Sequence, residues 1–211
     1  SVVSWGHPTL GVGETIYPSL DFKGSDGTLN VIDLAASAEA FAALRDDGSV
    51  LTWGHEGQNK GFDSSGVDFD GPNDDLSVVD LYSTDMGFAA LRNDGSVVSW
   101  GTNLNVSSVD VDGPYDDLDI VDIYSSRIGW PGPGSFAALR SDGSLISWGV
   151  SGNTPATLQE SSATSGRTVL DVVANHDAFS ALLSDGSVVA WGVGSHSNTS
   201  GVDFDGPNDD L

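Results

Sequence analysis

The sequence predicts an all-β protein, a β-propeller or propeller segment built from repeats of about 47 residues. Three observations predict it. A Trp-Gly pair recurs at intervals of 43 to 48 residues, a Phe stands twelve residues before four of these tryptophans, and an Asp-Gly pair lies between the two each time. The pairs begin at Trp5, Trp53, Trp100, Trp148 and Trp191. A fixed period of this length is typical of a tandem-repeat architecture.

Each repeat is predicted to contain a β-hairpin. Asp-Gly supplies the positive backbone angles of a tight turn, and apolar runs such as FAAL and VVSW flank it. These runs are nearly continuous, which indicates strands covered on both faces. A further aliphatic strand precedes each hairpin, at residues 31–36, 78–83, 120–125 and 169–174. Small sheets of three or four strands, buried on both sides, need neighbours to stack against, and radial stacking gives a propeller.

The chain is expected to be a single propeller unit. Its repeats fall at approximately residues 1–30 (partial), 31–76, 77–118, 119–168 and 169–211. It holds five Trp-Gly strands but four complete hairpins, so we expect either a segment of a longer array or ends that another copy of the chain completes. Flanking repeats or other copies of the chain are therefore expected partners, and the alternative is a protein or cell-surface ligand.

Composition excludes several functions. The chain has 31 Asp and Glu against 7 Lys and Arg, a formal net charge of -24, which disfavours nucleic acids and anionic membranes and favours cations and basic proteins. It contains no cysteine, so disulfides and thiol nucleophiles are excluded. No apolar run is long enough to cross a bilayer, so membrane insertion is not expected.

The repeat has a recognisable consensus. V-x-D-[LI] followed by FAALRxDGSVxxWG resembles the repeat of the regulator of chromosome condensation family, whose blades carry a comparable aliphatic strand, L-x-x-DG turn and terminal W-G. GHEGQNKG at 54–61 is similar to that family's W-G-x-n-x-x-G-Q-L-G ending. The match is closer still to divergent repeats of large secreted or surface-attached bacterial proteins. The resemblance implies an extracellular or cell-surface propeller that serves as a binding or structural scaffold without catalysis.

An acidic loop is the second repeated element. It reads GVDFDGPNDDL at 66–76 and again at 201–211, and VDVDGPYDDL at 109–118, with another oxygen donor five residues before the first Asp. Oxygen-only, carboxylate-rich loops suit a hard cation with six to eight ligands, so the pattern predicts calcium before magnesium. The predicted ligands are Asp68, Asp70, Asp74 and Asp75 with Asp63; Asp110, Asp112, Asp116 and Asp117 with Asn105; and Asp203, Asp205, Asp209 and Asp210 with Asn198.

The alternative is that these loops are solvated turns, because Asp, Gly, Pro and Asn are common turn residues and acidic loops keep proteins soluble. Residues 21–34 help to decide, since they align without gaps on 68–81 while three carboxylate positions become Lys23, Gly27 and Thr28. A lysine in place of a ligand is interpreted as an ammonium that replaces the cation.

Other repeated residues are predicted to be structural. The aspartates of the aliphatic strands are expected to bond a neighbouring backbone, the arginines before each turn to pair with the adjacent Asp, and the Trp-Gly tryptophans to lie in the core. Trp130, in an insert that breaks the repeat, is the candidate for partner binding. The strand aspartates are Asp33, Asp80, Asp122 and Asp171, and the arginines are Arg45, Arg92 and Arg140.

These patterns predict a non-catalytic structural or adhesive repeat module, extracellular or at a cell surface, stabilised by bound calcium. One alternative is a protein-binding or inhibitor module whose acidic loops engage a basic partner. Another is a hydrolase with a site in the central channel, but the sequence has no G-x-S-x-G, phosphate-loop or H-E-x-x-H motif, and its four histidines occupy no repeated position. We therefore do not expect an enzyme.

Overall fold

The described residues contain twelve strands in four small sheets. The computed structural model describes residues 21–54, 63–71, 74–102, 104, 119–127, 132–150 and 166–192. Within these ranges the chain is all-β, and each sheet holds three antiparallel strands in chain order. No helix in these ranges is long and apolar enough to span a membrane. The predicted all-β fold of small antiparallel sheets is confirmed.

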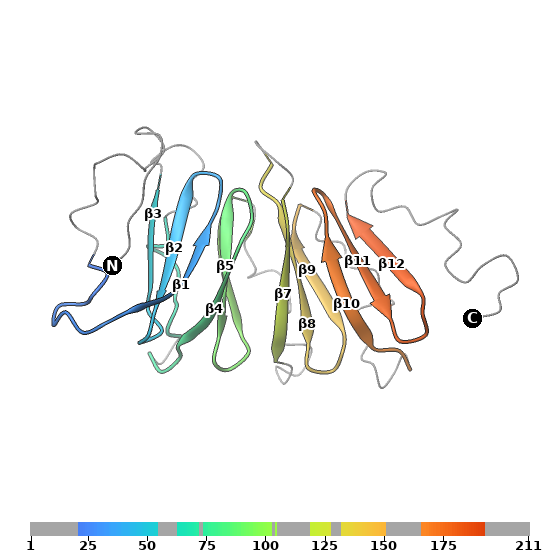
Figure 1. Cartoon of the computed structure of the whole chain (residues 1–211), viewed down its shortest axis with the longest axis horizontal. Helices are drawn as coiled ribbons and strands as arrows, with labels where there is room; N and C mark the ends of the chain where they lie inside the picture. The colour runs from blue at the N-terminus through green and yellow to red at the C-terminus, as the bar shows by residue number, and fades with distance from the viewer. Residues whose placement is uncertain are drawn as a thin grey trace, which may run out of the picture.

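The sheets stand side by side in chain order (Figure 1). The first contains β1 (Val31–Ala36), β2 (Ala40–Arg45) and β3 (Val50–Gly54), and the second β4 (Val78–Ser83), β5 (Gly87–Arg92) and β6 (Val97–Gly101). The third contains β7 (Ile120–Ser126), β8 (Ser135–Arg140) and β9 (Leu145–Gly149), and the fourth β10 (Val169–Ala174), β11 (Ala178–Leu183) and β12 (Val188–Gly192).

The twelve-residue spacing of Phe and Trp is a cross-strand pair. Phe88 of β5 lies opposite Trp100 of β6, and their rings stack with centroids 5.3 Å apart. Between them Asp94 Oδ1 accepts hydrogen bonds from the Ser96 N–H at 3.0 Å and the Ser96 hydroxyl at 2.6 Å. The other three hairpins repeat the register, and Trp53, Trp100, Trp148 and Trp191 are 2–4% exposed. The prediction of core tryptophans is thus confirmed at these four positions, while Trp5 lies outside the described residues.

The core consists of layers between neighbouring sheets. Phe88 and Ala90 of β5 pack toward the first sheet, and Ala89, between them, packs toward the third. All three are fully buried, because successive side chains of a strand point to opposite faces. The prediction that apolar runs mark strands covered on both faces is confirmed here.

The turns of the first two hairpins also join their sheets to the next one. The Gly48 carbonyl accepts the Val78 N–H at 3.3 Å, and the Gly95 carbonyl accepts the Ile120 N–H at 3.0 Å. A Cβ atom on Gly48 would lie 2.5 Å from the Ser77 Cβ. Glycine therefore supplies the positive φ of the turn and also leaves room for the next sheet.

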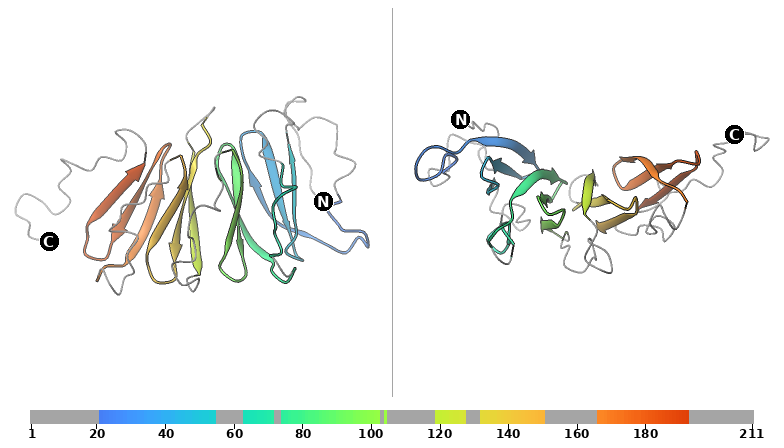
Figure 2. Two further views of the ribbon diagram at one scale, coloured as in Figure 1. Left: turned by 180° about the vertical axis from the view of Figure 1, so that it is seen from behind. Right: turned by 90° about the horizontal axis from the view of Figure 1, so that it is seen from below.

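The two end sheets each present an open face. Leu34 of β1 is 54% exposed, whereas the equivalent Leu81 of β4 is 7% exposed because the first sheet covers it. On the far side of the last sheet, Val173 is 59% exposed. The four sheets follow a shallow arc, with β1, β4, β7 and β10 along its inner side (Figure 2, right).

Candidate functional site

The acidic loop that is described, residues 63–71 and 74–77, leads into β4. Its tip is closed by two backbone hydrogen bonds, from the Asp74 N–H to the Gly71 carbonyl at 3.0 Å and from the Leu76 N–H to the Asp70 carbonyl at 2.9 Å. Gly71 has a φ of 75° and Asp74 a φ of 55°. Asp tolerates this left-handed region better than most residues, so the sequence suits the turn.

An arginine and a pair of aromatic rings hold the acidic loop against the second sheet. The Phe69 ring meets Trp100 edge-on, with centroids 5.1 Å apart and an interplanar angle of 90°. Arg92 of β5 donates from Nε to the Phe69 carbonyl at 3.2 Å and from Nη2 to the Asp68 carbonyl. Sequence analysis missed this role. The recurrence of the arginine was visible, but its reach across 24 residues is a tertiary contact.

The predicted pairing of these arginines with the turn aspartate is confirmed for Arg45, whose Nε lies 3.8 Å from Asp47 Oδ1. Arg45 has a second role that matches that of Arg92, because its Nη1 donates to the Asp21 carbonyl at 3.1 Å. Arg45 therefore holds the first loop from the end of β2, as Arg92 holds the acidic loop from the end of β5.

The first loop, residues 21–30, repeats this geometry without the three carboxylates. Phe22 meets Trp53 edge-on at 5.2 Å and 87°, and the Leu29 N–H donates to the Lys23 carbonyl at 2.9 Å. The Gly27 N–H donates to the Gly24 carbonyl at 2.9 Å. The gapless alignment of the two loops is thus reflected in their hydrogen bonds. The backbone of the loop does not depend on the carboxylates that one copy has lost.

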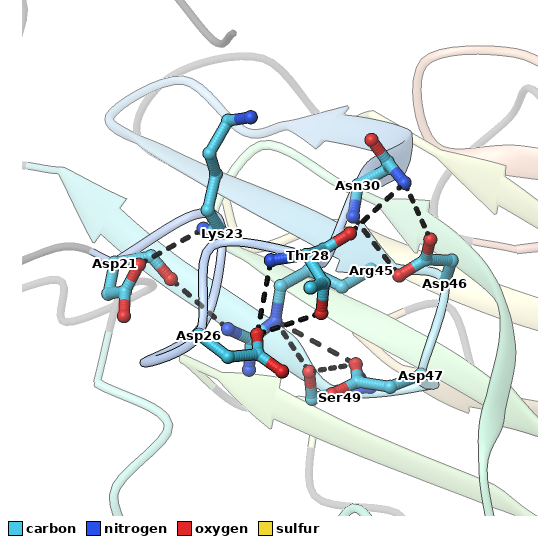
Figure 3. A network of polar contacts seen from close by, with 9 residues as sticks. All are labelled: Asp21, Lys23, Asp26, Thr28, Asn30, Arg45, Asp46, Asp47 and Ser49. Carbon is cyan, nitrogen blue, oxygen red and sulfur yellow. Dashed lines mark hydrogen bonds and ion pairs between the residues drawn. The ribbon is translucent and has the colours of Figure 1, made fainter.

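Lys23 does not occupy a cation position. Its side chain is exposed and points away from the carboxylates of Asp21 and Asp26 (Figure 3). Asp26 is satisfied locally, since its Oδ1 accepts the Thr28 hydroxyl at 2.7 Å and the Thr28 N–H at 3.1 Å, and the hydroxyl bond is the main cause that lowers the pKa of Asp26. This is not the arrangement expected of an ammonium that replaces a bound cation.

A cleft of about 440 Å³ lies between the acidic loop and the turn of the first hairpin. Four carboxylates line it, from Asp47, Asp70, Asp74 and Asp75, and we call it the acidic cleft. No Lys or Arg is among its lining residues, and the three loop carboxylates are exposed. Its remaining walls are Gly48, Ser49, Val50, Val67, Phe69, Leu76 and Ser77. The cleft combines carboxylates with apolar side chains, which suits a basic, partly apolar surface.

The predicted ligands of the first acidic loop are only partly brought together. Asp70, Asp74 and Asp75 line the acidic cleft, while Asp63 and Asp68 do not. Asp63 instead accepts the Ser65 hydroxyl at 2.6 Å. Across the described part of the chain, no three His, Cys, Asp or Glu side chains are grouped to hold a metal ion.

The other predicted site residues lie outside the described residues. They are Asp110, Asp112, Asp116, Asp117 and Asn105 of the second acidic loop, Asp203, Asp205, Asp209, Asp210 and Asn198 of the third, and Trp130.

The inner strands β1, β4, β7 and β10 each carry one aspartate at the same position. Asp33, Asp80 and Asp122 each accept the N–H of the next residue, at 2.7, 2.8 and 2.8 Å, so the predicted backbone bond is confirmed for these three. Burial, the Asp122 charge, a hydrogen bond to Asp122 and the Asp171 charge raise the pKa of Tyr124 to about 12. Burial and the neighbouring Asp80 and Asp122 likewise raise the pKa of Tyr82. Adjacent sheets thus place their strand aspartates close enough to act on a shared tyrosine.

Stacked three-stranded sheets whose innermost strands lie side by side define a β-propeller, and comparison with solved structures agrees. The chain is similar to Prp20p from Saccharomyces cerevisiae, in a structure described with its binding to Gsp1p and histones: TM-score 0.52, 20% identity, 82% of this chain and 46% of that chain. It is also similar to yeast RCC1 (Prp20) bound to Kap60: TM-score 0.53, 19% identity, 82% of this chain and 46% of that one. The chain spans less than half the length of these propellers. No protein-family model and no curated protein matches the sequence.

Proposed function

We propose that the chain is a non-catalytic protein-binding module of a β-propeller, and that the acidic cleft engages a basic surface of its partner. The observation that carries this proposal is the cleft itself, which the exposed carboxylates of Asp70, Asp74 and Asp75 line together with apolar side chains, while the fourth carboxylate, Asp47, lies 3.8 Å from Arg45. Charge of one sign along a cleft raises the local concentration of an oppositely charged partner and speeds association.

Two further observations support the proposal. The loop that carries the carboxylates is fixed by Arg92 and by the Phe69–Trp100 contact, so that little ordering is required on binding. The similar yeast propellers are described with protein partners, namely Gsp1p and histones in one structure and Kap60 in another. The overall charge of -24 favours basic partners over nucleic acids.

The proposal is tested with a panel of basic proteins, including lysozyme, cytochrome c and histones, in the presence of chelator. We expect saturable binding of at least one, weakened about tenfold by raising salt from about 50 to 300 mM. The triple variant Asp70→Asn, Asp74→Asn, Asp75→Asn should weaken it by a similar factor. The matched control Asp21→Asn, Asp26→Asn, Asp46→Asn removes the same charge outside the cleft and should change it little. Equal losses of affinity in the two variants would show that net charge, and not the acidic cleft, determines binding.

A second proposal concerns a cation at the same carboxylates. Asp70, Asp74 and Asp75 line one cleft, and gathered carboxylates favour a hard divalent cation such as calcium. In the described arrangement they do not form a metal-holding group of three, so binding would require them to draw together. The Lys23 loop forms the equivalent backbone hydrogen bonds without these carboxylates, which indicates that calcium would neutralise charge rather than fold the loop.

Calcium binding is tested by thermal melting. We expect excess chelator to lower the melting temperature of the wild type by several degrees and to leave the Asp70→Asn, Asp74→Asn, Asp75→Asn variant unchanged. An identical wild-type melt with calcium and with chelator would refute the cation at this loop. The extracellular or cell-surface location implied by the sequence resemblance stays a prediction.

A further inference from the structure

The four sheets pack on one another through a row of side chains that recurs in each sheet. Residues directly opposite one another in neighbouring strands point to the same face of a sheet. On the face turned toward the preceding sheet, which we call the front face, the row reads aliphatic, alanine, aliphatic. The rows that lie in the core layer against the preceding sheet are Leu81–Ala90–Val98, Ile123–Ala138–Ile146 and Val172–Ala181–Val189.

The face turned toward the next sheet, the back face, has its own recurring residues. A small residue of the middle strand leaves room for the front-face row of the next sheet, and an aliphatic pair lies beside it. The pairs that contain the small residue are Ala35–Ala42, Tyr82–Ala89 and Tyr124–Ala137, and the aliphatic pairs are Leu44–Val50, Leu91–Val97 and Leu139–Leu145. Three joints of the same chemistry therefore hold the four sheets together.

The front face of the first sheet carries the same row without a described sheet against it. Leu34, Ala43 and Leu51 lie opposite one another across β1, β2 and β3. Leu34 is 54% exposed and Leu51 is half-buried, with the fully buried Ala43 between them. The equivalent Leu81 is only 7% exposed, because the first sheet covers it. The first sheet thus presents an unused front face.

The back face of the fourth sheet is unused in the same way, at the other end of the row of sheets (Figure 1). Val173 of β10 lies opposite Ser180 of β11, and Leu182 lies opposite Val188 of β12. Val173 is 59% exposed and Leu182 is 39% exposed, while Ser180 keeps the small volume of the alanines at this position. Stacked repeats stay soluble when their outermost faces are polar. These two faces are aliphatic, which is the pattern of a contact surface.

The two unused faces are the two halves of the joint that recurs three times within the chain. We propose that a second copy of the chain docks head to tail, so that the front face of its first sheet packs on the back face of the fourth sheet. Leu34 of one copy then lies against Val173 and Leu182 of the other. The contact joins two different surfaces and is therefore heterologous. Two front faces are a poor match, because neither offers the small residue that receives the aliphatic row.

This association goes beyond the proposed function, because the acidic cleft lies between the first two sheets and not on either end face. Each copy has a formal net charge of -24, so that the copies repel one another and the contact is weak. We expect a dissociation constant on the order of 100 µM at about 300 mM salt, so that the chain is monomeric at a few micromolar. Lower salt weakens the contact by removing the screening, the opposite of its effect on a basic partner.

Sedimentation equilibrium of the full chain tests the association. Between about 10 and 500 µM, at about 300 mM salt, we expect the average mass to rise from that of the monomer to at least about one and a half times that value. At about 50 mM salt the rise should be smaller. A monomer mass at every concentration, or an association that high salt abolishes, would overturn the proposal.

Two variants, each with one face blocked, distinguish a head-to-tail contact from the alternatives. Leu34→Lys blocks the front face and Val173→Lys blocks the back face, so each variant alone should remain monomeric. An equimolar mixture should form a dimer and nothing larger, because one variant keeps its back face and the other its front face. An association that only Leu34→Lys abolishes would indicate a front-to-front contact, and a monomeric mixture of the two folded variants would exclude the proposed joint. Either result would overturn the inference.

Val79→Lys is the matched control, because Val79 is an aliphatic residue that is 51% exposed and lies on neither end face. It adds the same charge and should associate within about twofold of the wild type. Melting temperatures check that each variant folds, and the milder Leu34→Gln and Val173→Thr should each weaken association at least about threefold if a lysine variant does not fold. The cleft variant Asp70→Asn, Asp74→Asn, Asp75→Asn should associate at least as well as the wild type. A loss in the cleft variant with none in the two face variants would overturn the inference while leaving the proposed function intact.

Discussion

The Gly95 backbone lies directly against Asp119, so that a Cβ atom on Gly95 would fall 2.5 Å from the Asp119 Cβ and 2.7 Å from its Cα. Gly95 is the turn glycine of the second hairpin, and Asp119 precedes the first strand of the third sheet. This contact joins two neighbouring blades. The equivalent Gly186 of the last hairpin has no described neighbour within 4 Å of such an atom.

The two glycines form a matched pair for measuring the joint between blades. They have φ values of 82° and 84°, so an alanine at either position costs about 1–2 kcal/mol of backbone strain. Gly95→Ala should lower the free energy of unfolding by about 1–3 kcal/mol more than Gly186→Ala does, because its methyl group overlaps the backbone that leads into the next sheet. Chemical denaturation measures both variants. Equal free energies of unfolding would show that the sheets do not approach as closely as described.

Leu81 and Leu34 test the open face of the first sheet. They are equivalent leucines that are 7% and 54% exposed. Leu81→Ala should lower the free energy of unfolding by about 2–4 kcal/mol and Leu34→Ala by less than about 1 kcal/mol. A comparable loss at Leu34 would indicate that another blade or another copy covers this face in solution.

Arg92→Lys tests how the acidic loop is held. Lysine keeps the charge but lacks the forked guanidinium that reaches the carbonyls of Phe69 and Asp68. We expect a loss of about 1 kcal/mol in unfolding free energy, together with faster proteolysis within residues 63–77. Arg127→Lys, whose guanidinium donates to the Ser83 hydroxyl at 3.3 Å in an exposed position, is the control and should stay within about 0.5 kcal/mol. Unchanged stability and proteolysis of Arg92→Lys would contradict the role assigned to the arginine.

The Asp94-Gly95-Ser96 turn predicts a loss of stability in acid. Burial raises the pKa of Asp94, but bonds from the Ser96 hydroxyl and N–H and the Arg92 charge outweigh it, so that the pKa is lowered overall. A carboxyl with a lowered pKa in the folded state stabilises the protein above its unfolded pKa, and that contribution is lost as pH falls through the folded value. The melting temperature should drop between about pH 5 and pH 2, and less in Asp94→Asn. An equal drop of the melting temperature in the wild type and in Asp94→Asn would show that other groups cause the acid sensitivity.

Local rules accounted for the hairpins and not for the contacts between distant segments. Asp94-Gly95 fixes the turn and the spacing from Phe88 to Trp100 fixes the register, so a short stretch of sequence was enough to predict both. The support of Phe69 by Arg92 and the approach of Gly95 to Asp119 join segments separated by a loop, which no periodicity encodes. The acidic loop was recognised, but the cleft that it forms with the hairpin turn at Asp47 joins segments that are distant in sequence.

Hydrogen–deuterium exchange of the full chain, with and without a bound basic protein, tests the central claim most directly. The account predicts added protection in the segments that line the acidic cleft, residues 47–50, 67–71 and 74–77, and its disappearance in the Asp70→Asn, Asp74→Asn, Asp75→Asn variant. Protection confined to other segments, or protection in the cleft that survives the triple substitution, would contradict the assignment of the acidic cleft as the binding surface.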